Sequence, residues 1–455
     1  MRAGIAGLVR GGSLKNRAMR SSGFSTLGFG AHQALRLGSN LVLTRLLFPE
    51  AFGMMALVAM ILQGLAMFSD TGVRPAILRS ARGDDMDFLN TAWTIQVGRG
   101  FLLWIAACGL AWPLAAFYGE PELAAYLPVA ALSLIVAGFN PTRRHTANRH
   151  LRIGRVTAIE IVAQTLSLLV TIGLAALLAS VWALVFSHVI GAMVSLILAT
   201  LFLPGKWNRL RWDRSAAQEL ISFGKWIFLS TAGGFFFTQG DKIVLGRYLS
   251  LEIFGIYNIG YFLASFPLML GRMVTNRVLI PIYRERPPDA SADNFAALRK
   301  MRVLVTSTLL TLLMVAAYGG AWAVDVLYDP RYAMAGSVVV LIAAMQVPQV
   351  VGLTYDQAAL AAGDSRRFFI LTATKASLAL AGLVIGFEVA GLAGALIAQG
   401  ISFLMAYPVL VWLARRQGAW DPAHDALFIV LGAVLAAGAI WINWPSVAQL
   451  FAERM

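Results

Sequence analysis

The sequence predicts an all-α integral membrane protein with two six-helix lobes, related by a parallel internal repeat around a central cavity, plus one or two extra C-terminal helices. Three observations predict this class: an apolar composition, basic residues confined to alternate loops, and a segment that occurs twice. Apolar residues make up 58% of the chain and charged residues 13%, which lies outside the range of soluble globular chains. Cys108 has no second cysteine with which to form a disulfide or a metal site, and no cofactor or metal is expected.

Apolar runs of about 20 residues, long enough to cross a bilayer as a helix, define the expected spans. About twelve runs are clear, and one more follows them. The runs cover residues 24–46, 51–72, 89–117, 122–140, 155–178, 181–203, 221–247, 252–280, 300–323, 333–353, 368–387, 389–414 and 424–442. The segment "NWPSVAQLFAERM" that follows is too short and polar to span, which leaves the count open between thirteen and fourteen helices.

Basic residues gather on one side of these spans. The N-terminal tail and every second loop carry lysines and arginines, whereas the opposite loops, such as "YGEPE" and "EVAG", are short and nearly free of them. The positive-inside rule therefore predicts a cytoplasmic N-terminus. This distribution also explains the formal charge of +14 without a nucleic-acid partner. The first span lacks a small-residue cleavage site, so we expect it to be retained rather than removed as a signal peptide.

The expected domain organisation follows from the spans and the loops between them. Loops are short on both faces, the longest being about 281–300, so no soluble domain could hold an active site, and the chain is not expected to be an enzyme. The expected parts are a basic cytoplasmic tail (1–22), an N-terminal six-helix lobe (23–205), a cytoplasmic linker (206–220), a C-terminal six-helix lobe (221–416) and an additional helix with a tail (424–455).

The duplicated segment reads "VLTRLLFPEAFG" at Val42–Gly53 and "VLGRYLSLEIFG" at Val244–Gly255. Aligned without gaps, both copies keep Val, Leu, Arg, Leu, Glu, Phe and Gly in register. Each copy is expected to join the end of one helix to the start of the next, and about six spans separate the copies, which predicts two lobes of like orientation. Two such bundles leave a crevice that rocking exposes to alternate sides, as in transporters. The alternative is a duplicated scaffold without transport function.

Charged and polar residues inside the spans are the candidate binding residues, because a charge in the bilayer is costly unless it faces protein, water or a partner. Cations outnumber acids there, which predicts a cavity of positive potential. Arginine also binds phosphate in a bidentate way that lysine cannot match. The expected substrate-binding residues are Arg36, Arg99, His32, Asn40, Asp241, Lys242, Arg272 and Lys375.

These residues are expected on five helices. His32, Arg36 and Asn40 are spaced i, i+4, i+8 and form one polar stripe, and Arg99 lies deep in the third span. Arg272 could instead extend to the headgroups. The adjacent Asp241 and Lys242 could form a neutralising pair at the outer rim of the membrane. Glu160 and Gln164, also spaced i, i+4, are expected to join helices rather than bind substrate.

The duplicated segments resemble the paired signatures of a known family. The stretches "LVLTRLLFPEAFGMMALVAMI", "FSDTGVRPAIL" and "QGDKIVLGRYLSLEIFGIYNIGYFLASFP" look like those of the polysaccharide transporter family, the Wzx-type oligosaccharide flippases of the superfamily that also holds multidrug extruders. The resemblance covers about residues 15–415. It implies twelve to fourteen helices in two lobes, with a cationic lumen for pyrophosphate, to which Arg36 and Arg99 would contribute.

The resemblance also implies a substrate and partners. The substrate would be an oligosaccharide on undecaprenyl pyrophosphate, moved from the inner to the outer leaflet of a bacterial inner membrane for exopolysaccharide, capsule or O-antigen synthesis. The partners would be membrane lipids, a polysaccharide polymerase and a chain-length regulator. Two other functions remain as alternatives. A drug or cation antiporter of the same architecture would need carboxylates in the lumen, and a membrane glycosyl polymerase or ligase would need a catalytic constellation on a large outer loop.

Overall fold

The computed structural model describes residues 14–70, 72–150 and 152–452, and all regular secondary structure in these ranges is helical. The predicted all-α class is therefore confirmed. Two compact units emerge: Met1–Leu47 with Met54–Ala232 (unit 1), and Phe48–Gly53 with Gly233–Met455 (unit 2). Residues 1–13 of the expected basic tail lie outside the described residues.

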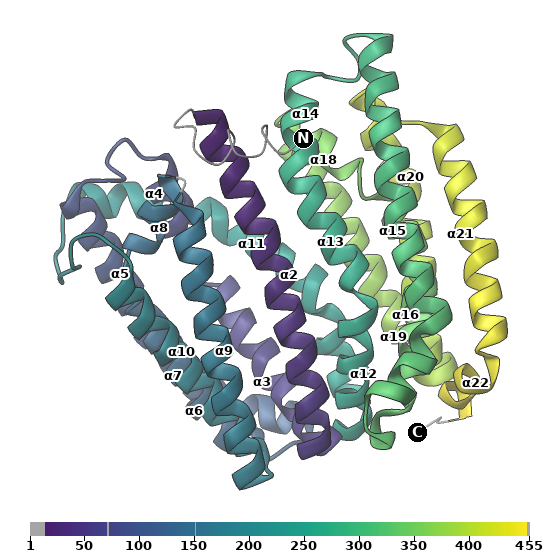
Figure 1. The fold of residues 1–455 in the computed structure, drawn as a ribbon, viewed down its shortest axis with the longest axis horizontal. Coiled ribbons are helices and arrows are strands. Elements are labelled where there is room, and N and C mark those ends of the chain that lie inside the picture. Colours follow the sequence, from purple (N-terminus) through teal and green to yellow (C-terminus); the bar gives the residue numbers. More distant parts are fainter. Residues whose placement is uncertain (1–13, 71, 151, 453–455) are drawn as a thin grey trace, which may run out of the picture. The chain divides into compact units, whose positions relative to one another are not determined.

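Unit 1 is built from long helices with short ones between them (Figure 1). Its helices are α2 (Leu14–Leu46), α3 (Pro49–Met67) from Met54 onward, α4 (Val73–Arg79), α5 (Met86–Tyr118), α6 (Leu123–Ala130), α7 (Leu132–Gly138), α8 (Arg143–Arg149), α9 (Ile153–Leu178), α10 (Val181–Phe202) and the first part of α11 (Arg214–Tyr248). Helix α9 packs against α2 and α10, while α5 packs against α6 and α7.

Two helices of unit 1 begin earlier than the sequence predicted. Helix α2 begins at Leu14, inside the expected 1–22 tail, because "LKNRAMRS" consists mainly of good helix formers and has no proline. Helix α11 begins at Arg214, inside the expected 206–220 linker. Asp213 caps it: its carboxylate accepts hydrogen bonds from the Ser215 hydroxyl (2.6 Å) and the Ala216 N–H (2.7 Å).

The remaining linker is held along the start of α5. Backbone N–H groups of alternate linker residues donate to polar side chains of α5: Arg209 to Asn90 Oδ1, Arg211 to Thr94 Oγ1 and Asp213 to Thr91 Oγ1, each at 3.0 Å. Alternate residues of an extended segment point the same way, which explains the spacing. The segment between α10 and α11 is therefore bound to unit 1 rather than loose.

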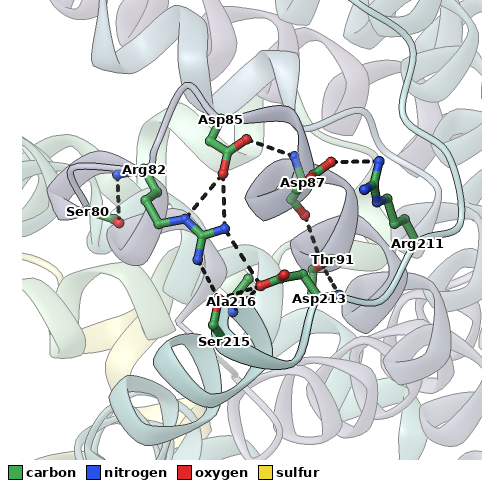
Figure 2. A network of polar contacts seen from close by, with 9 residues as sticks. All are labelled: Ser80, Arg82, Asp85, Asp87, Thr91, Arg211, Asp213, Ser215 and Ala216. Carbon is green, nitrogen blue, oxygen red and sulfur yellow. Dashed lines mark hydrogen bonds and ion pairs between the residues drawn. The ribbon is translucent and has the colours of Figure 1, made fainter.

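Arg82 reinforces this attachment (Figure 2). Its guanidinium donates to Asp85 Oδ2 (3.0 and 3.2 Å) and to Ser215 Oγ (2.8 Å), and it lies 3.6 Å from Asp213 Oδ1. The N–H of Asp87 lowers the pKa of Asp85, and the Ser215 hydroxyl lowers the pKa of Asp213. Both carboxylates are thus held in the charged form that pairs with Arg82.

Unit 2 holds the rest of α11 and the helices that follow it (Figure 1). They are α12 (Leu251–Ala264), α13 (Phe266–Val274), the π-helix η1 (Thr275–Leu279), α14 (Ile280–Glu285), α15 (Ala292–Leu327), the 3₁₀ turn η2 (Pro330–Tyr332), α16 (Met334–Met345), α17 (Val347–Gly352), α18 (Asp356–Ala361), α19 (Ser365–Met405), α20 (Tyr407–Arg416), α21 (Pro422–Ile442) and α22 (Trp444–Ala452). Helix α16 packs against α12, α15, α19, α21 and α22 and lies at the centre of the core. The expected loop 281–300 shrinks to the six residues between α14 and α15.

Prolines break several predicted spans of unit 2. Proline lacks a backbone N–H and its ring clashes with the preceding turn. The breaks at Ser265 and Gln346 each come two residues before a proline, Pro267 and Pro348. Helix α19 instead turns at Gly391, whose φ of 60° favours glycine, so the two spans predicted at 368–387 and 389–414 form a hairpin.

The number of membrane spans depends on how broken helices are counted. Within the described residues, seven helices are long and apolar enough to cross a membrane, or nine if each bent pair is one span. Helices α2 and α11 occupy predicted spans but carry many polar residues. Helix α22, with nine residues, is about 14 Å long at 1.5 Å per residue, too short to span. It packs on α16, where Ser337 Oγ donates to Ser446 O (2.8 Å).

Both copies of the duplicated segment form the same corner. Helix α2 ends at Leu46 and α3 begins at Pro49, just as α11 ends at Tyr248 and α12 begins at Leu251. Inside unit 2 the two corners touch backbone to backbone. A Cβ on Gly53 would lie 2.0 Å from Leu251 O, and one on Gly255 would lie 2.0 Å from Pro49 O. The corner thus has the same shape in both copies, and the glycine of each copy packs closely against the backbone of the other. The repeat of six helices remains a prediction.

Candidate functional site

His32, in the polar stripe on α2, is engaged by another helix. The His32 ring Nδ1 lies within hydrogen-bond distance of Gln164 Oε1 on α9, and Gln164 Nε2 donates to the His32 carbonyl oxygen (3.1 Å). Such a reciprocal pair joins α2 to α9. Arg36, one turn further, is an exposed residue of this helix, and the half-buried Asn40 makes no side-chain hydrogen bond within the described ranges. His32 is therefore placed at a helix contact by its hydrogen bonds.

Arg99 on α5 is directed toward the C-terminal end of α3. Its Nε donates to Ser69 Oγ (3.0 Å) and its Nη2 donates to the carbonyl oxygen of Ala66 (2.5 Å), in the last turn of that helix. Carbonyl groups at a helix C-terminus carry partial negative charge, which favours a cation. Both acceptors are neutral, and Arg99 forms no ion pair with any carboxylate of the described chain. Asp70 acts on Arg99 electrostatically without contacting it, so protein compensates the guanidinium charge only in part.

Glu160, the acid of the α9 span, is paired. Its carboxylate accepts a hydrogen bond from the Arg144 guanidinium of α8. Together with the Gln164 to His32 pair, this shows both polar residues of α9 in contacts between helices, as the i, i+4 spacing predicted. Among the described residues, Arg99 thus differs from Arg144, whose guanidinium is paired with Glu160.

Unit 2 contains a polar cavity of about 110 Å³. Helices α11, α12, α13, α16, α17 and α19 contribute to its wall, and the helix breaks at Ser265 and Gln346 both lie on it. The lining residues are Phe237, Thr238, Asp241, Tyr261, Ser265, Leu268, Met269, Arg272, Ile342, Met345, Gln346, Gln349, Leu396, Gln399, Gly400 and Phe403. The cavity therefore includes two of the predicted binding residues, Asp241 and Arg272.

Asp241 and Lys242 have different surroundings although they are adjacent. The Asp241 side chain is buried and accepts a hydrogen bond from the Tyr257 hydroxyl (2.6 Å). The Lys242 ammonium lies 5.9 Å from the centre of the Tyr261 ring. Successive residues of a helix point about 100° apart, so neighbours in sequence reach different partners. Asp241 is thus held inside unit 2 by a tyrosine of α12.

Arg272 has no carboxylate partner in the described chain. Its guanidinium lies over the Phe237 ring, 5.5 Å from the ring centre, a cation–π contact that leaves its hydrogen-bond donors at the cavity wall. Lys375 differs, because its Nζ lies 3.1 Å from both carboxylate oxygens of Asp356 on α18. Lys375 is therefore neutralised, and it does not line the cavity of Asp241 and Arg272.

Sequence reasoning missed several residues of this site. Asp356 was overlooked as an intramembrane acid because it sits at the start of the short helix α18 rather than in a long apolar run. The glutamines of the cavity were missed because an uncharged amide does not stand out in a count of charges. Pro348 was an available signal: it predicts a helix break near Gln346, and breaks expose polar groups within a membrane.

Among the described residues, no group of three or more His, Cys, Asp or Glu side chains is arranged to hold a metal ion. The candidate sites are therefore the arginine of unit 1 and the amide-rich cavity of unit 2, each built from side chains that bind by hydrogen bonds and charge.

Comparisons with known proteins agree with a membrane transport architecture. A family model described as "Polysaccharide biosynthesis protein" matches residues 42–336. The chain is 22% identical over 411 residues to the lipopolysaccharide biosynthesis protein WzxC of Escherichia coli (strain K12), covering 88% of this chain and 82% of the relative. It is 23% identical over 332 residues to the succinoglycan biosynthesis transport protein ExoT of Rhizobium meliloti (strain 1021), covering 71% of this chain and 65% of the relative.

The fold is also similar to that of solved transporters. A multidrug resistance MATE family transporter of the MOP superfamily, in its inward-facing conformation, superimposes with a TM-score of 0.62 at 16% identity, covering 85% of this chain and 95% of the other. At this identity the similarity concerns the fold alone.

Proposed function

Because the chain belongs to the family of polysaccharide biosynthesis proteins, we propose that it is a flippase for undecaprenyl-pyrophosphate-linked oligosaccharide repeat units. It would move them from the cytoplasmic to the periplasmic leaflet of a bacterial inner membrane, for exopolysaccharide, capsule or O-antigen synthesis. The names of two relatives, a lipopolysaccharide biosynthesis protein and a succinoglycan transport protein, support this substrate class. The alternation of basic loops supports a cytoplasmic N-terminus.

The observation that carries the proposal is a pair of arginines without carboxylate partners. Arg99 of unit 1 and Arg272 of unit 2 contact only neutral groups among the described residues. A guanidinium within a membrane protein is costly unless water or an anion accompanies it. A pyrophosphate supplies that anion, and the planar donors of arginine fit its oxygens. The opposite arrangement, with lumen carboxylates in excess, would suit a cation antiporter.

The predicted residues differ in the roles that they have in this proposal. Arg99, with Arg36 on α2, binds the pyrophosphate. Lys375 is set apart, because Asp356 already balances its charge. His32 positions α2 against α9 through its hydrogen bonds with Gln164.

Movement of the headgroup would follow alternating exposure of a cavity between two lobes, with the prenyl chain remaining in lipid. The step needs no covalent chemistry. An inside-negative potential favours outward movement of an anion by about 2.3 kcal/mol per charge per 100 mV. The flipped repeat unit would then be available to a polysaccharide polymerase and its chain-length regulator on the outer face.

The test is reconstitution of the purified protein in liposomes with a labelled undecaprenyl-pyrophosphoryl oligosaccharide, followed by leaflet accessibility. Arg99→Gln and Arg272→Gln should each slow flipping by about 10- to 100-fold, the effect of removing a hydrogen bond to a charged group. Arg45→Gln, at the exposed end of α2, is the matched control and should flip at the wild-type rate.

Arg99 also contacts the end of α3, so thermal unfolding of each variant separates loss of function from loss of fold. Arg272 contacts no helix end and provides a variant without that ambiguity. The proposal would be rejected if the wild-type protein moved no lipid-linked saccharide but transported an organic cation, or if both arginine variants flipped like Arg45→Gln.

A further inference from the structure

The cavity of unit 2 has a recognition chemistry distinct from that of Arg99. Three glutamines and three hydroxyl groups reach its wall, from four different helices and two helix breaks. These residues are Gln346, Gln349, Gln399, Thr238, Tyr261 and Ser265. The Gln349 and Gln399 amides make no side-chain hydrogen bond within the described part of the chain, so each has both a donor and an acceptor available.

Gln346 lines the cavity and has a side-chain oxygen without a hydrogen-bond partner among the described residues. Its side chain is only 6% exposed, yet its Oε1 accepts no hydrogen bond from any described residue. Buried polar atoms are nearly always paired, and an exception calls for an explanation. Its position at the break before Pro348 fixes it at the junction of α16 and α17. A ligand with an O–H or N–H group in the cavity would complete this acceptor.

The two charged side chains of the cavity have opposite signs, and each already contacts a neighbouring side chain. The cavity contains one acid and one base, Asp241 and Arg272. The Tyr257 hydroxyl donates to the first, and the second stacks on Phe237. The amides and hydroxyls of the wall match neutral groups that both donate and accept hydrogen bonds. The volume of the cavity, about 110 Å³, is on the scale of an engineered cavity of roughly 150 Å³ that holds a benzene ring.

We propose that this cavity binds one sugar ring of the lipid-linked saccharide, with Gln346, Gln349 and Gln399 contacting the ring hydroxyls. The inference rests on the proposed function and assigns the saccharide to unit 2 while the phosphate is bound by arginine. Phe403 and Phe237 provide apolar walls against which the C–H face of a pyranose can pack. The glutamines then determine which saccharides are accepted.

The experiment measures binding of two lipids to the full-length protein in nanodiscs. One is undecaprenyl pyrophosphate, and the other is the lipid-linked repeat unit extracted from the producing organism after deletion of this gene. The variant is Gln346→Leu, which removes the amide at nearly constant volume. Gln63→Leu, on an exposed face of α3, is the control for loss of a glutamine. Thermal unfolding is recorded for all proteins.

Wild-type protein should bind the saccharide lipid more tightly than the bare lipid. Gln346→Leu should reduce that preference by about two- to tenfold, the scale of one net hydrogen bond, and leave affinity for the bare lipid unchanged. Gln63→Leu should keep the wild-type preference. A Gln346→Leu variant that retains the full preference, or that weakens both lipids equally, overturns the inference. If wild type binds both lipids equally, the inference fails alone, and if it binds neither, the proposed function fails as well.

Discussion

Replacing either glycine of the duplicated corner by alanine should destabilise unit 2. A Cβ at position 255 would lie 2.0 Å from Pro49 O and 2.9 Å from Gly53 N, and one at position 53 would lie 2.0 Å from Leu251 O. An ordinary contact begins at 3.4 Å, so the helices must separate by about 3.4 − 2.0 = 1.4 Å. The atoms with which the new Cβ would clash belong to the backbone, so they cannot move away by a side-chain rotation. Overpacking of this kind costs about 1–3 kcal/mol.

The reciprocal geometry also leads to a prediction for the double variant. One separation of α3 from α12 relieves both clashes, so Gly53→Ala and Gly255→Ala together should cost less than the sum of the single variants, with a coupling of about 0.5–3 kcal/mol. The assay is thermal and denaturant unfolding of the detergent-solubilised protein. Gly109→Ala on α5 is the control, because a Cβ there meets nothing within 4 Å. Single variants that unfold like Gly109→Ala, or costs that add, would refute the reasoning.

Three further predictions concern other parts of the chain. Lys375→Met should destabilise the protein by about 1–3 kcal/mol by leaving Asp356 unpaired, and adding Asp356→Leu should recover most of that loss in the same unfolding assay. Gly391→Ala should cost about 1–3 kcal/mol because of its φ of 60°, seen as a lower unfolding temperature. Asp85 and Asp213 have lowered pKa values, so their stabilisation is complete above the unfolded value near 3.9 and is lost as the pH falls through the lower folded values. Hydrogen exchange of the Asp213 amide, corrected for its intrinsic rate, should therefore show constant protection from about pH 5 to 8.

The fold could be predicted from the sequence where long apolar runs and a repeated corner determine it. Every predicted span contains helix, and the corners begin and end within a few residues of the predicted positions. The helix start at Arg214 was not predictable from hydropathy, because that turn is polar and is fixed by the cap at Asp213.

The site was predicted less completely than the fold. Hydropathy identifies an intramembrane charge such as Arg99 or Lys375, but it does not identify its partner, because Asp356 and Ala66 approach only through tertiary packing. The same limit applies to Gln346, whose unpaired oxygen depends on the absence of a neighbour in space. A count of charges thus predicts the sign of the electrostatic potential in a membrane cavity but not the identity of the groups on its wall.

The grouping of Phe48–Gly53 with unit 2 has a consequence for biosynthesis. The side chains that hold the linker, on α5, are all synthesised before the linker itself, so this part of unit 1 can be completed as the chain emerges from the ribosome. The first turn of α3 is different, because its backbone contact is with Leu251, about two hundred residues later. That turn therefore cannot acquire its native backbone packing until translation has passed the second corner.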